Sequence, residues 1–189
     1  MPCRVSGLLE QTVAHGAAGR ADSEVNVDRR GPVNGSVRVR SGSMTLKKRG
    51  KFQYGDSQED IRDELLRYGK KNKHAAHHFA DAICKCGGKL FGLSLDDNEG
   101  AAVRTCVGCK TEHAIGDSDE FLEEAELEEC ACPCGGEAFE ITIGVSLYED
   151  SEDVRWLYLG CRCPKCGLTA VYGDWKNEFN GYKKLLKRV

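Results

Sequence analysis

Cysteine spacing is the feature that most constrains how this chain of 189 residues can fold. Ten of its 11 cysteines fall in close groups, and Cys3 stands alone. Aromatic residues make up only 7% of the chain, so we expect cross-links or metals to supply stability that apolar burial cannot. The groups are Cys84 with Cys86, Cys106 with Cys109, Cys130 with Cys132 and Cys134, and Cys161 with Cys163 and Cys166.

The rest of the sequence favours metal ligation over disulfides. Its first 22 residues contain no apolar core of signal-peptide length. Nowhere does it contain the run of about 18 apolar residues that spans a bilayer. We therefore expect a cytoplasmic protein with no membrane association, and in a reducing cytosol clustered cysteines act as metal ligands.

An internal repeat begins at Cys84. Each copy begins with C-x-C-G-G, and 19 or 28 residues separate its second cysteine from a C-x-x-C turn. In the first spacer LFGLSL and AAVRT flank the turn DDNEG, and in the second FEITIGVSL and VRWLYLG flank EDSED. Apolar residues alternate with polar ones in these segments, which predicts a β-hairpin between the cysteine turns of each copy.

A hairpin that joins two cysteine turns suits zinc, because tetrahedral zinc takes four sulfurs at about 2.3 Å. Residues 84–110 and 132–168 resemble the zinc-ribbon superfamily at the level of the class, with C-x-C in place of the usual first C-x-x-C. We expect two zinc ions. The predicted ligands are Cys84, Cys86, Cys106 and Cys109 for the first, and Cys132, Cys134, Cys163 and Cys166 for the second.

Two cysteines and several histidines remain outside this assignment. Cys130 and Cys161 each stand two residues before the first ligand of a pair. They can exchange into the metal shell, form a redox-sensitive pair or be buried thiols, and we favour buried thiols. His74 and His78 lie one helical turn apart on a face that we expect to be exposed, and His113 is not needed as a ligand.

The N-terminal part contains one biased segment and one helical pattern. Residues 1–50 lack hydrophobic periodicity and are expected to be a disordered tail. Translation that begins at Met44 is a second hypothesis for this part, and an RNA-binding arm a third. Ser57 predicts a helix N-cap, and helical spacing that resumes from Ala75 predicts a second short helix or one kinked helix over residues 56–83.

Together these patterns predict a small, metal-stabilised α+β fold with an N-terminal helix or helices, two tandem zinc-ribbon hairpins and a short C-terminal helix. Ser118 is expected to cap the acidic connector, and Tyr182, Leu185, Leu186 and Val189 follow at helical spacing. The predicted parts are 1–50, the helical segment 56–83, the first ribbon 84–116, the connector 117–129, and the second ribbon with its aromatic extension, 130–189.

Composition and site chemistry favour a protein-binding module over an enzyme. Four thiolates close a zinc site, and the sequence shows no nucleophile with a matched base and no phosphate loop. Residues 84–189 carry 12 Lys and Arg against 20 Asp and Glu, which disfavours a nucleic-acid backbone. Two alternatives stay open: a nucleic-acid-associated ribbon that stacks bases on Trp156 and Tyr158, and an immunity or antitoxin-type protein that neutralises a basic toxin.

Overall fold

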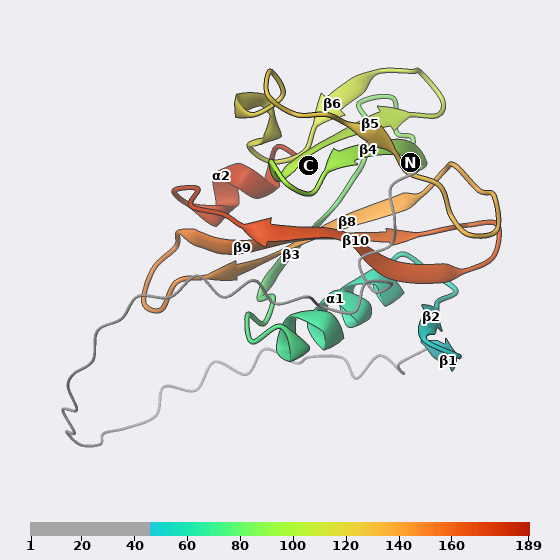
Figure 1. Ribbon diagram of the computed structural model, residues 1–189, viewed down its shortest axis with the longest axis horizontal. Helices are drawn as coiled ribbons and strands as arrows, with labels where there is room; N and C mark the ends of the chain where they lie inside the picture. The colour runs from blue at the N-terminus through green and yellow to red at the C-terminus, as the bar shows by residue number, and fades with distance from the viewer. Residues whose placement is uncertain (1–45) are drawn as a thin grey trace. The chain divides into compact units, whose positions relative to one another are not determined.

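The computed structural model describes residues 46–189 (Figure 1). Two antiparallel sheets make up most of this small α+β fold, with few helices. The hypotheses on residues 1–45, including the start at Met44, and the isolated Cys3 lie outside the described residues. No helix within 46–189 is long and apolar enough to cross a membrane.

Order begins earlier than we expected. Strands β1 (Lys47–Arg49) and β2 (Phe52–Tyr54) form an antiparallel pair ahead of helix α1 (Glu59–Lys71). The helix is present, but Ser57 does not cap it with its side chain. The carboxylate of Asp60 instead accepts the backbone N–H of Ser57 at 2.8 Å, which fixes the chain ahead of the first turn.

The prediction of helical structure from Ala75 to Ile83 is wrong. Strand β3 (His78–Asp81) lies there and pairs antiparallel with β8 (Glu140–Leu147). Its backbone groups bind the edge of β8, so pairing between distant segments outweighs the local helical spacing of the apolar residues.

Each repeat contributes its predicted hairpin to a different sheet. In the four-stranded sheet the order is β6-β5-β4-β7, and in the six-stranded sheet it is β1-β2-β10-β9-β8-β3. The strands not yet given are β4 (Phe91–Asp96), β5 (Ala101–Cys106), β6 (Glu112–Ala114), β7 (Glu128–Glu129), β9 (Val154–Arg162) and β10 (Leu168–Lys176). We call residues 84–114 repeat 1 and residues 132–176 repeat 2.

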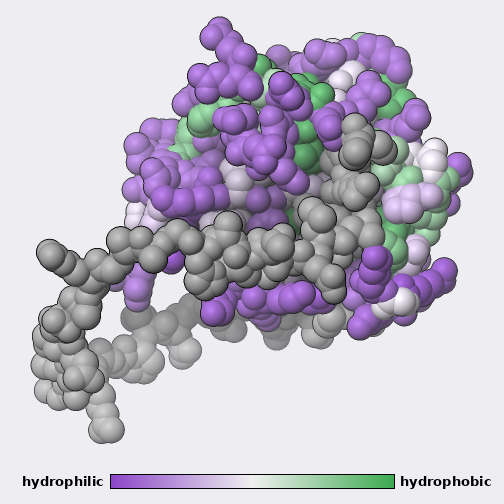
Figure 2. Space-filling model, viewed as in Figure 1, coloured by the Kyte–Doolittle hydropathy of each residue, from purple (hydrophilic) through white to green (hydrophobic). Residues whose placement is uncertain are grey.

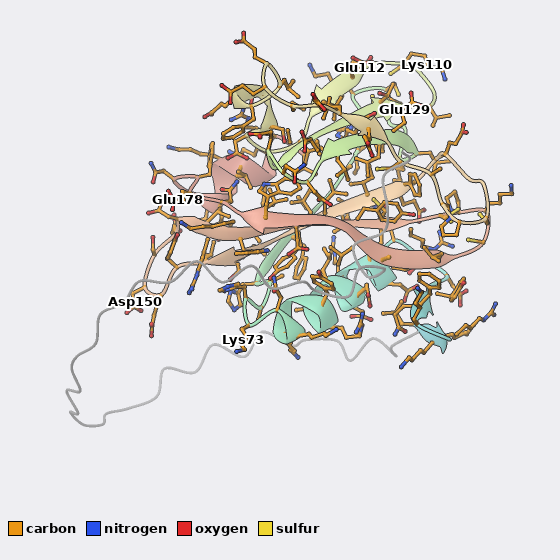
Figure 3. The ribbon with its side chains drawn as sticks, viewed as in Figure 1. Lys73, Lys110, Glu112, Glu129, Asp150 and Glu178 are labelled. Atoms are coloured by element: carbon orange, nitrogen blue, oxygen red, sulfur yellow. The ribbon has the colours of Figure 1, made fainter. Side chains whose placement is uncertain are left out.

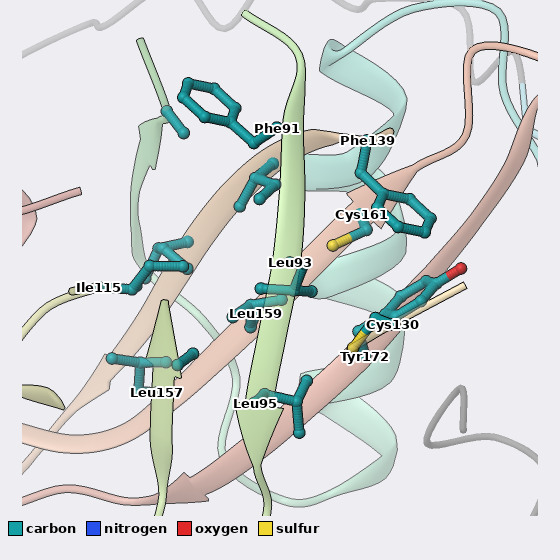
Figure 4. Packing of buried hydrophobic residues seen from close by; sticks show 14 of the residues in the cluster. Phe91, Leu93, Leu95, Ile115, Cys130, Phe139, Leu157, Leu159, Cys161 and Tyr172 are labelled. Carbon is teal, nitrogen blue, oxygen red and sulfur yellow. The ribbon is translucent and has the colours of Figure 1, made fainter. Parts of the chain in front are cut away.

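The apolar faces of the two sheets share one core (Figure 4). Leu93 and Leu95 of β4 pack in the same cluster as Leu157 and Leu159 of β9 and Tyr172 of β10. All five side chains are nearly inaccessible to solvent. The core therefore extends across the boundaries between the two predicted ribbons.

Helix α1 covers the other face of the six-stranded sheet. Ile61 and Leu65 are fully buried there and pack with Tyr158 and Val171. The contact is close, since a Cβ atom added to Gly160 of β9 would lie 2.5 Å from Cγ2 of Ile61. Glycine at this position lets the helix approach the sheet.

Two further segments complete the fold. In the acidic connector, Ser118 begins a 3-10 turn, η1 (Ser118–Glu120), but it is buried and makes no cap. Its hydroxyl donates to the carbonyl of Ile115 at 2.6 Å, so the capping prediction is wrong. At the C-terminus the predicted short helix is present as α2 (Tyr182–Leu186), which buries Leu185 and contacts β3 and β8.

The repeats meet at equivalent residues. Phe91 and Phe139 each stand seven residues after the first cysteine of C-x-C-G-G. The backbone N–H of each donates to the carbonyl of the other, and both N–O distances are 2.9 Å. Reciprocal bonds between equivalent residues are the pattern that a two-fold axis produces.

The strands that lead into the repeats cross over. Ala82 and Cys130 each stand two residues before the first cysteine of their own repeat. The N–H of Ala82 donates to Ile141 of repeat 2 at 2.9 Å, and the N–H of Cys130 donates to Leu93 of repeat 1 at 2.8 Å. Each repeat is thus extended by the strand that leads into the other: β3 pairs with β8, and β7 with β4.

Candidate metal centres

The structure brings the eight predicted cysteine ligands into two groups of four. Within each group all sulfurs lie within 4.8 Å of one another. In group 1 the Sγ atoms of Cys84 and Cys109 are 3.4 Å apart, and those of Cys86 and Cys106 are 3.6 Å apart. Each pair joins one cysteine of the C-x-C turn to one of the C-x-x-C turn, so the hairpin sets the spacing.

Group 2 has the same geometry. The Sγ atoms of Cys132 and Cys166 are 3.6 Å apart, and those of Cys134 and Cys163 are 3.7 Å apart. Four sulfurs at 2.3 Å from a central zinc ion are about 3.8 Å from one another, whereas a disulfide brings two sulfurs to about 2.05 Å. All eight residues are free cysteines, and their spacing fits a tetrahedral metal ion.

The glycines of C-x-C-G-G have separate roles in the turn. The first glycine has a positive φ, 83° in repeat 1 and 75° in repeat 2, which other residues adopt at a cost. The second glycine lies against the sulfurs. A Cβ atom on Gly88 would be 3.0 Å from Sγ of Cys106, and one on Gly136 would be 2.9 Å from Sγ of Cys163.

Without a cation the four thiols of group 1 cannot all ionise. Hydrogen bonds from the side chain and backbone of Thr111 lower the pKa of Cys109 to about 6. At Cys86 the backbone N–H of Gly88 favours the thiolate, but hydrogen bonds among the neighbouring thiols outweigh it and raise its pKa to about 12. A divalent cation at the centre removes this conflict by stabilising every thiolate.

Group 2 shows the same division. Burial raises the pKa of Cys132 well above its ordinary value. Burial also acts on Cys134, but hydrogen bonds from Cys132 and Cys166 outweigh it and lower the pKa of Cys134 to about 7. Each group therefore combines one readily ionised thiol with one that resists ionisation.

Arg104, which the sequence patterns did not single out, stands beside group 1. Its side chain is 4% exposed, and within residues 46–189 its Nε and Nη1 atoms have no hydrogen-bond partner. The guanidinium carbon lies 4.5 Å from the centre of the Phe91 ring, and its charge acts on Cys84 and Cys106. The signal in the sequence is a lone cation on the apolar strand AAVRT, two residues before Cys106.

The two remaining cysteines of the described chain lie outside both groups. Cys161 carries a free thiol with no exposed surface, and burial raises its pKa well above the ordinary value. A redox-sensitive bond between Cys161 and Cys130 is therefore absent. Cys130 is buried too, with 4% of its surface exposed, and packs in the core shared by the two sheets.

The histidines and aromatic residues have structural partners. The ring of His74 stacks on Trp156 at 4.8 Å between centroids, and that of His78 on Tyr182 at 3.9 Å, so neither imidazole is fully exposed as expected. Tyr158 is completely buried and donates its hydroxyl to the carbonyl of His74. Tyr158 is thus not available for base stacking, and His74 covers the Trp156 ring.

A hollow of about 740 Å³ lies beside β3 and the β8–β9 turn, between Lys73 and Asp150 in Figure 3. Imidazoles and carboxylates both line it, among them His77 and Glu152. Within residues 46–189, however, the two cysteine groups are the clusters with metal-binding spacing. The hollow therefore adds no candidate metal centre.

Comparisons with protein-family models, with curated proteins and with solved structures give no match for this chain. The interpretation of the two groups therefore rests on sulfur geometry and on the chemistry of the thiols.

Proposed function

We propose that this chain is a zinc-binding protein whose two closed metal centres hold a rigid body for binding a protein partner. The observation that carries the proposal is the spacing of the sulfurs, from 3.4 to 3.7 Å between the pairs in both groups. Four thiolates complete a tetrahedron and leave no position for a substrate, which is the arrangement of structural zinc.

Zinc is favoured among the metals that thiolates bind. Tetrahedral sites with four sulfurs select zinc or iron, whereas carboxylate and carbonyl oxygens select magnesium or calcium. Each group lies between the C-x-C and C-x-x-C turns at the open end of a hairpin, which supports the structural role. In this proposal the protein works in the reducing cytosol, where its free thiols stay available for the metal.

Charge supports a protein partner over a nucleic acid. Residues 84–189 carry 12 basic and 20 acidic residues, and each zinc centre with four thiolates adds a formal charge of about −2. A phosphate backbone is repelled by such a surface. The burial of Tyr158 also removes one of the two side chains on which the nucleic-acid alternative relied.

Metal analysis tests the first half of the proposal. Native mass spectrometry and elemental analysis of the full chain are expected to give two zinc ions. Cys109→Ser should reduce this to about one, since three thiolates bind zinc less tightly. Cys161→Ser is the matched control, because Cys161 is buried but outside both groups, and it should keep two. One metal ion in the unaltered chain, or none with disulfides in both groups, contradicts the proposal.

Fluorescence anisotropy tests the second half. Mixed-sequence single- and double-stranded DNA and RNA should show no appreciable binding to residues 44–189 at low salt, where the repulsion is least screened. Tight binding that a Trp156→Ala substitution weakens would instead favour the nucleic-acid alternative.

A further inference from the structure

Large apolar side chains reach the surface of the described chain at only two places. Five are exposed among residues 46–189: Ile83, Leu90, Val107, Phe121 and Leu127, with exposed fractions of 53, 37, 43, 40 and 38%. The first three lie in or directly next to the cysteine turns of repeat 1, and the last two lie in the acidic connector. Figure 2 shows apolar residues emerging between hydrophilic ones in the upper part of the molecule, where repeat 1 lies.

Ile83, Leu90 and Val107 are neighbours. The N–H of Val107 donates to the carbonyl of Leu90 at 3.0 Å, so the two lie opposite each other just beyond the paired ends of β4 and β5. The chain leaves the edge of β8 after Ala82 and returns to it at Phe91, since both bind carbonyls of that segment. Ile83 and Leu90 are therefore the first and last residues of the loop between Ala82 and Phe91.

Lysines surround these apolar residues. Lys85, Lys89 and Lys110 lie on the same two turns, and all three are exposed (Lys110 is labelled in Figure 3). None makes an ion pair within residues 46–189. We call Ile83, Leu90, Val107 and these three lysines the knuckle patch.

The knuckle patch is specific to repeat 1. The equivalent residues of repeat 2 are Ala131, Ala138 and Pro164 for the apolar residues, and Pro133, Glu137 and Gly167 for the lysines. Repeat 2 is also covered beside its second turn, where the N–H of Gly55 donates to the carbonyl of Gly167 at 2.8 Å and β2 pairs with β10. The corresponding strand of repeat 1, β6, has no such neighbour within residues 46–189.

The acidic connector has the opposite charge. Around Phe121 and Leu127 lie Glu123, Glu124 and Glu126, which are exposed and make no ion pair within residues 46–189. The backbone N–H of Glu124 donates a hydrogen bond to the carbonyl of Phe121, with an N–O distance of 3.1 Å, and holds the segment in a turn. We call these five residues the connector patch.

We propose that the knuckle patch of one copy of this chain binds the connector patch of a second copy. Each patch combines exposed apolar side chains with unpaired charges, and the charges are opposite in sign. The turns of the connector (yellow in Figure 1) and the turn that carries Lys110 (labelled in Figure 3, the same view) lie at opposite sides of repeat 1, so one chain does not join its own two patches. The knuckle patch has aliphatic side chains and no aromatic ring, which suits a protein surface better than nucleic-acid bases.

The contact has two consequences for assembly. It joins different surfaces, so the copies associate head to tail, into a ring or an open chain rather than a two-fold dimer. It is also small, so association is weak and concentration-dependent. The inference rests on the proposed zinc sites, because the cysteines of group 1 hold both turns of the knuckle patch.

Sedimentation velocity of the full chain, with single-surface variants, tests the proposal. The unaltered chain should associate as its concentration rises to about 1 mM, and less so at high salt. A knuckle variant (Leu90→Ser with Val107→Ser) and a connector variant (Phe121→Ser with Leu127→Ser) should each be monomeric. Their mixture should form one-to-one dimers and nothing larger, because one working copy of each patch remains. Ala138→Ser, at the position of repeat 2 equivalent to Leu90, is the control and should associate as the unaltered chain does.

Several results overturn the inference. The inference is wrong if the unaltered chain stays monomeric at every concentration or if both variants still associate. It is also wrong if the mixture of the two variants does not dimerise. Binding of a mixed-sequence oligonucleotide that the knuckle variant abolishes would replace the proposed partner with nucleic acid. Zinc is measured on the same samples: two zinc ions without association overturn the docking alone, whereas association without zinc supports the docking and overturns the metal sites.

Discussion

Arg104 of repeat 1 and Cys161 of repeat 2 occupy equivalent positions, each two residues before the first cysteine of C-x-x-C. Both side chains are buried, with 4 and 0% of their surface exposed. Group 1 therefore has a buried cation beside its thiols where group 2 has a neutral thiol. Because four thiolates around the proposed zinc ion would carry excess negative charge, we expect Arg104 to stabilise the metal-bound form of group 1 in a way that group 2 lacks.

Replacing Arg104 should loosen one zinc ion and not the other. Arg104→Met keeps the length of the side chain and removes its charge, so zinc at group 1 should be lost about 10- to 100-fold more readily. A chromogenic chelator should then take up one zinc ion per chain faster than before, while the second leaves at its original rate. Arg155→Met, an exposed arginine of β9, is the control. Equal acceleration of both zinc ions would contradict the assignment.

Asp97 makes stability depend on pH. Asp97 is exposed as a residue, but its carboxylate lies beside Gly173 of β10. The resulting loss of solvation and the nearby carboxylate of Asp174 raise its pKa to about 6 from an ordinary 3.8. Between these values the folded chain holds a proton that the unfolded chain has released, so stability falls as pH rises through this range. Asp97→Asn removes the charge, and its melting temperature should exceed that of the unaltered chain at pH 7.5.

The gain from Asp97→Asn should shrink as the pH is lowered toward about 5.5, because Asp97 then becomes protonated in the folded chain. Glu149→Gln, on the exposed β8–β9 turn, should show no such trend. A gain that is constant across this range would show that Asp97 is ionised throughout.

Gly160 sets the distance between α1 and the sheet. Gly160→Ala places a methyl group 2.5 Å from Cγ2 of Ile61 and 2.9 Å from Cδ2 of Leu65, so we expect a loss of about 1–3 kcal/mol in unfolding free energy. Gly92→Ala is the matched control, because Gly92 is also within a strand and its nearest neighbour would be 3.9 Å away. It should leave the stability unchanged or raise it slightly in a denaturant titration.

The two repeats should unfold together. Leu93 and Leu95 of repeat 1 pack in the same core as Leu157 of repeat 2. Cys166→Ser, which weakens group 2, should therefore reduce amide-exchange protection in β4 as well as in β10, and the thermal transition should stay single. Two separate transitions, with β4 still protected, would show that each repeat folds alone.

Cysteine spacing was enough to predict the two clusters of cysteines, because the contacts that form them are largely local. A C-x-C turn and a C-x-x-C turn each bring two sulfurs together within a few residues, and an alternating spacer such as Phe139–Leu147 leaves a hairpin as the simple way to join them. The resulting sulfur spacing follows from the sequence almost without tertiary information.

Other parts depended on contacts that the sequence does not display. The apolar residues from Ala75 to Ile83 have helical spacing, but part of this segment forms strand β3, which pairs with the edge of β8. Ser118 looks like a cap, but its hydroxyl is used inside the core. Arg104 is recognisable only once Phe91 and the thiols are placed around it. Each error arose where a distant partner outweighed a local preference.

The crossing of β3 and β7 has a consequence for how such a chain can vary. A shorter chain with only one repeat and its leading strand would leave the edge of its hairpin and that leading strand unpaired. It could pair them only with a second identical molecule, so it would be an obligate homodimer. Within one polypeptide the same arrangement forms at any dilution. The two repeats can also differ in sequence, because a substitution in one repeat of a single chain changes one site, whereas in a homodimer it would change two. Leu90 at one turn and Ala138 at the other are the kind of divergence that this freedom permits.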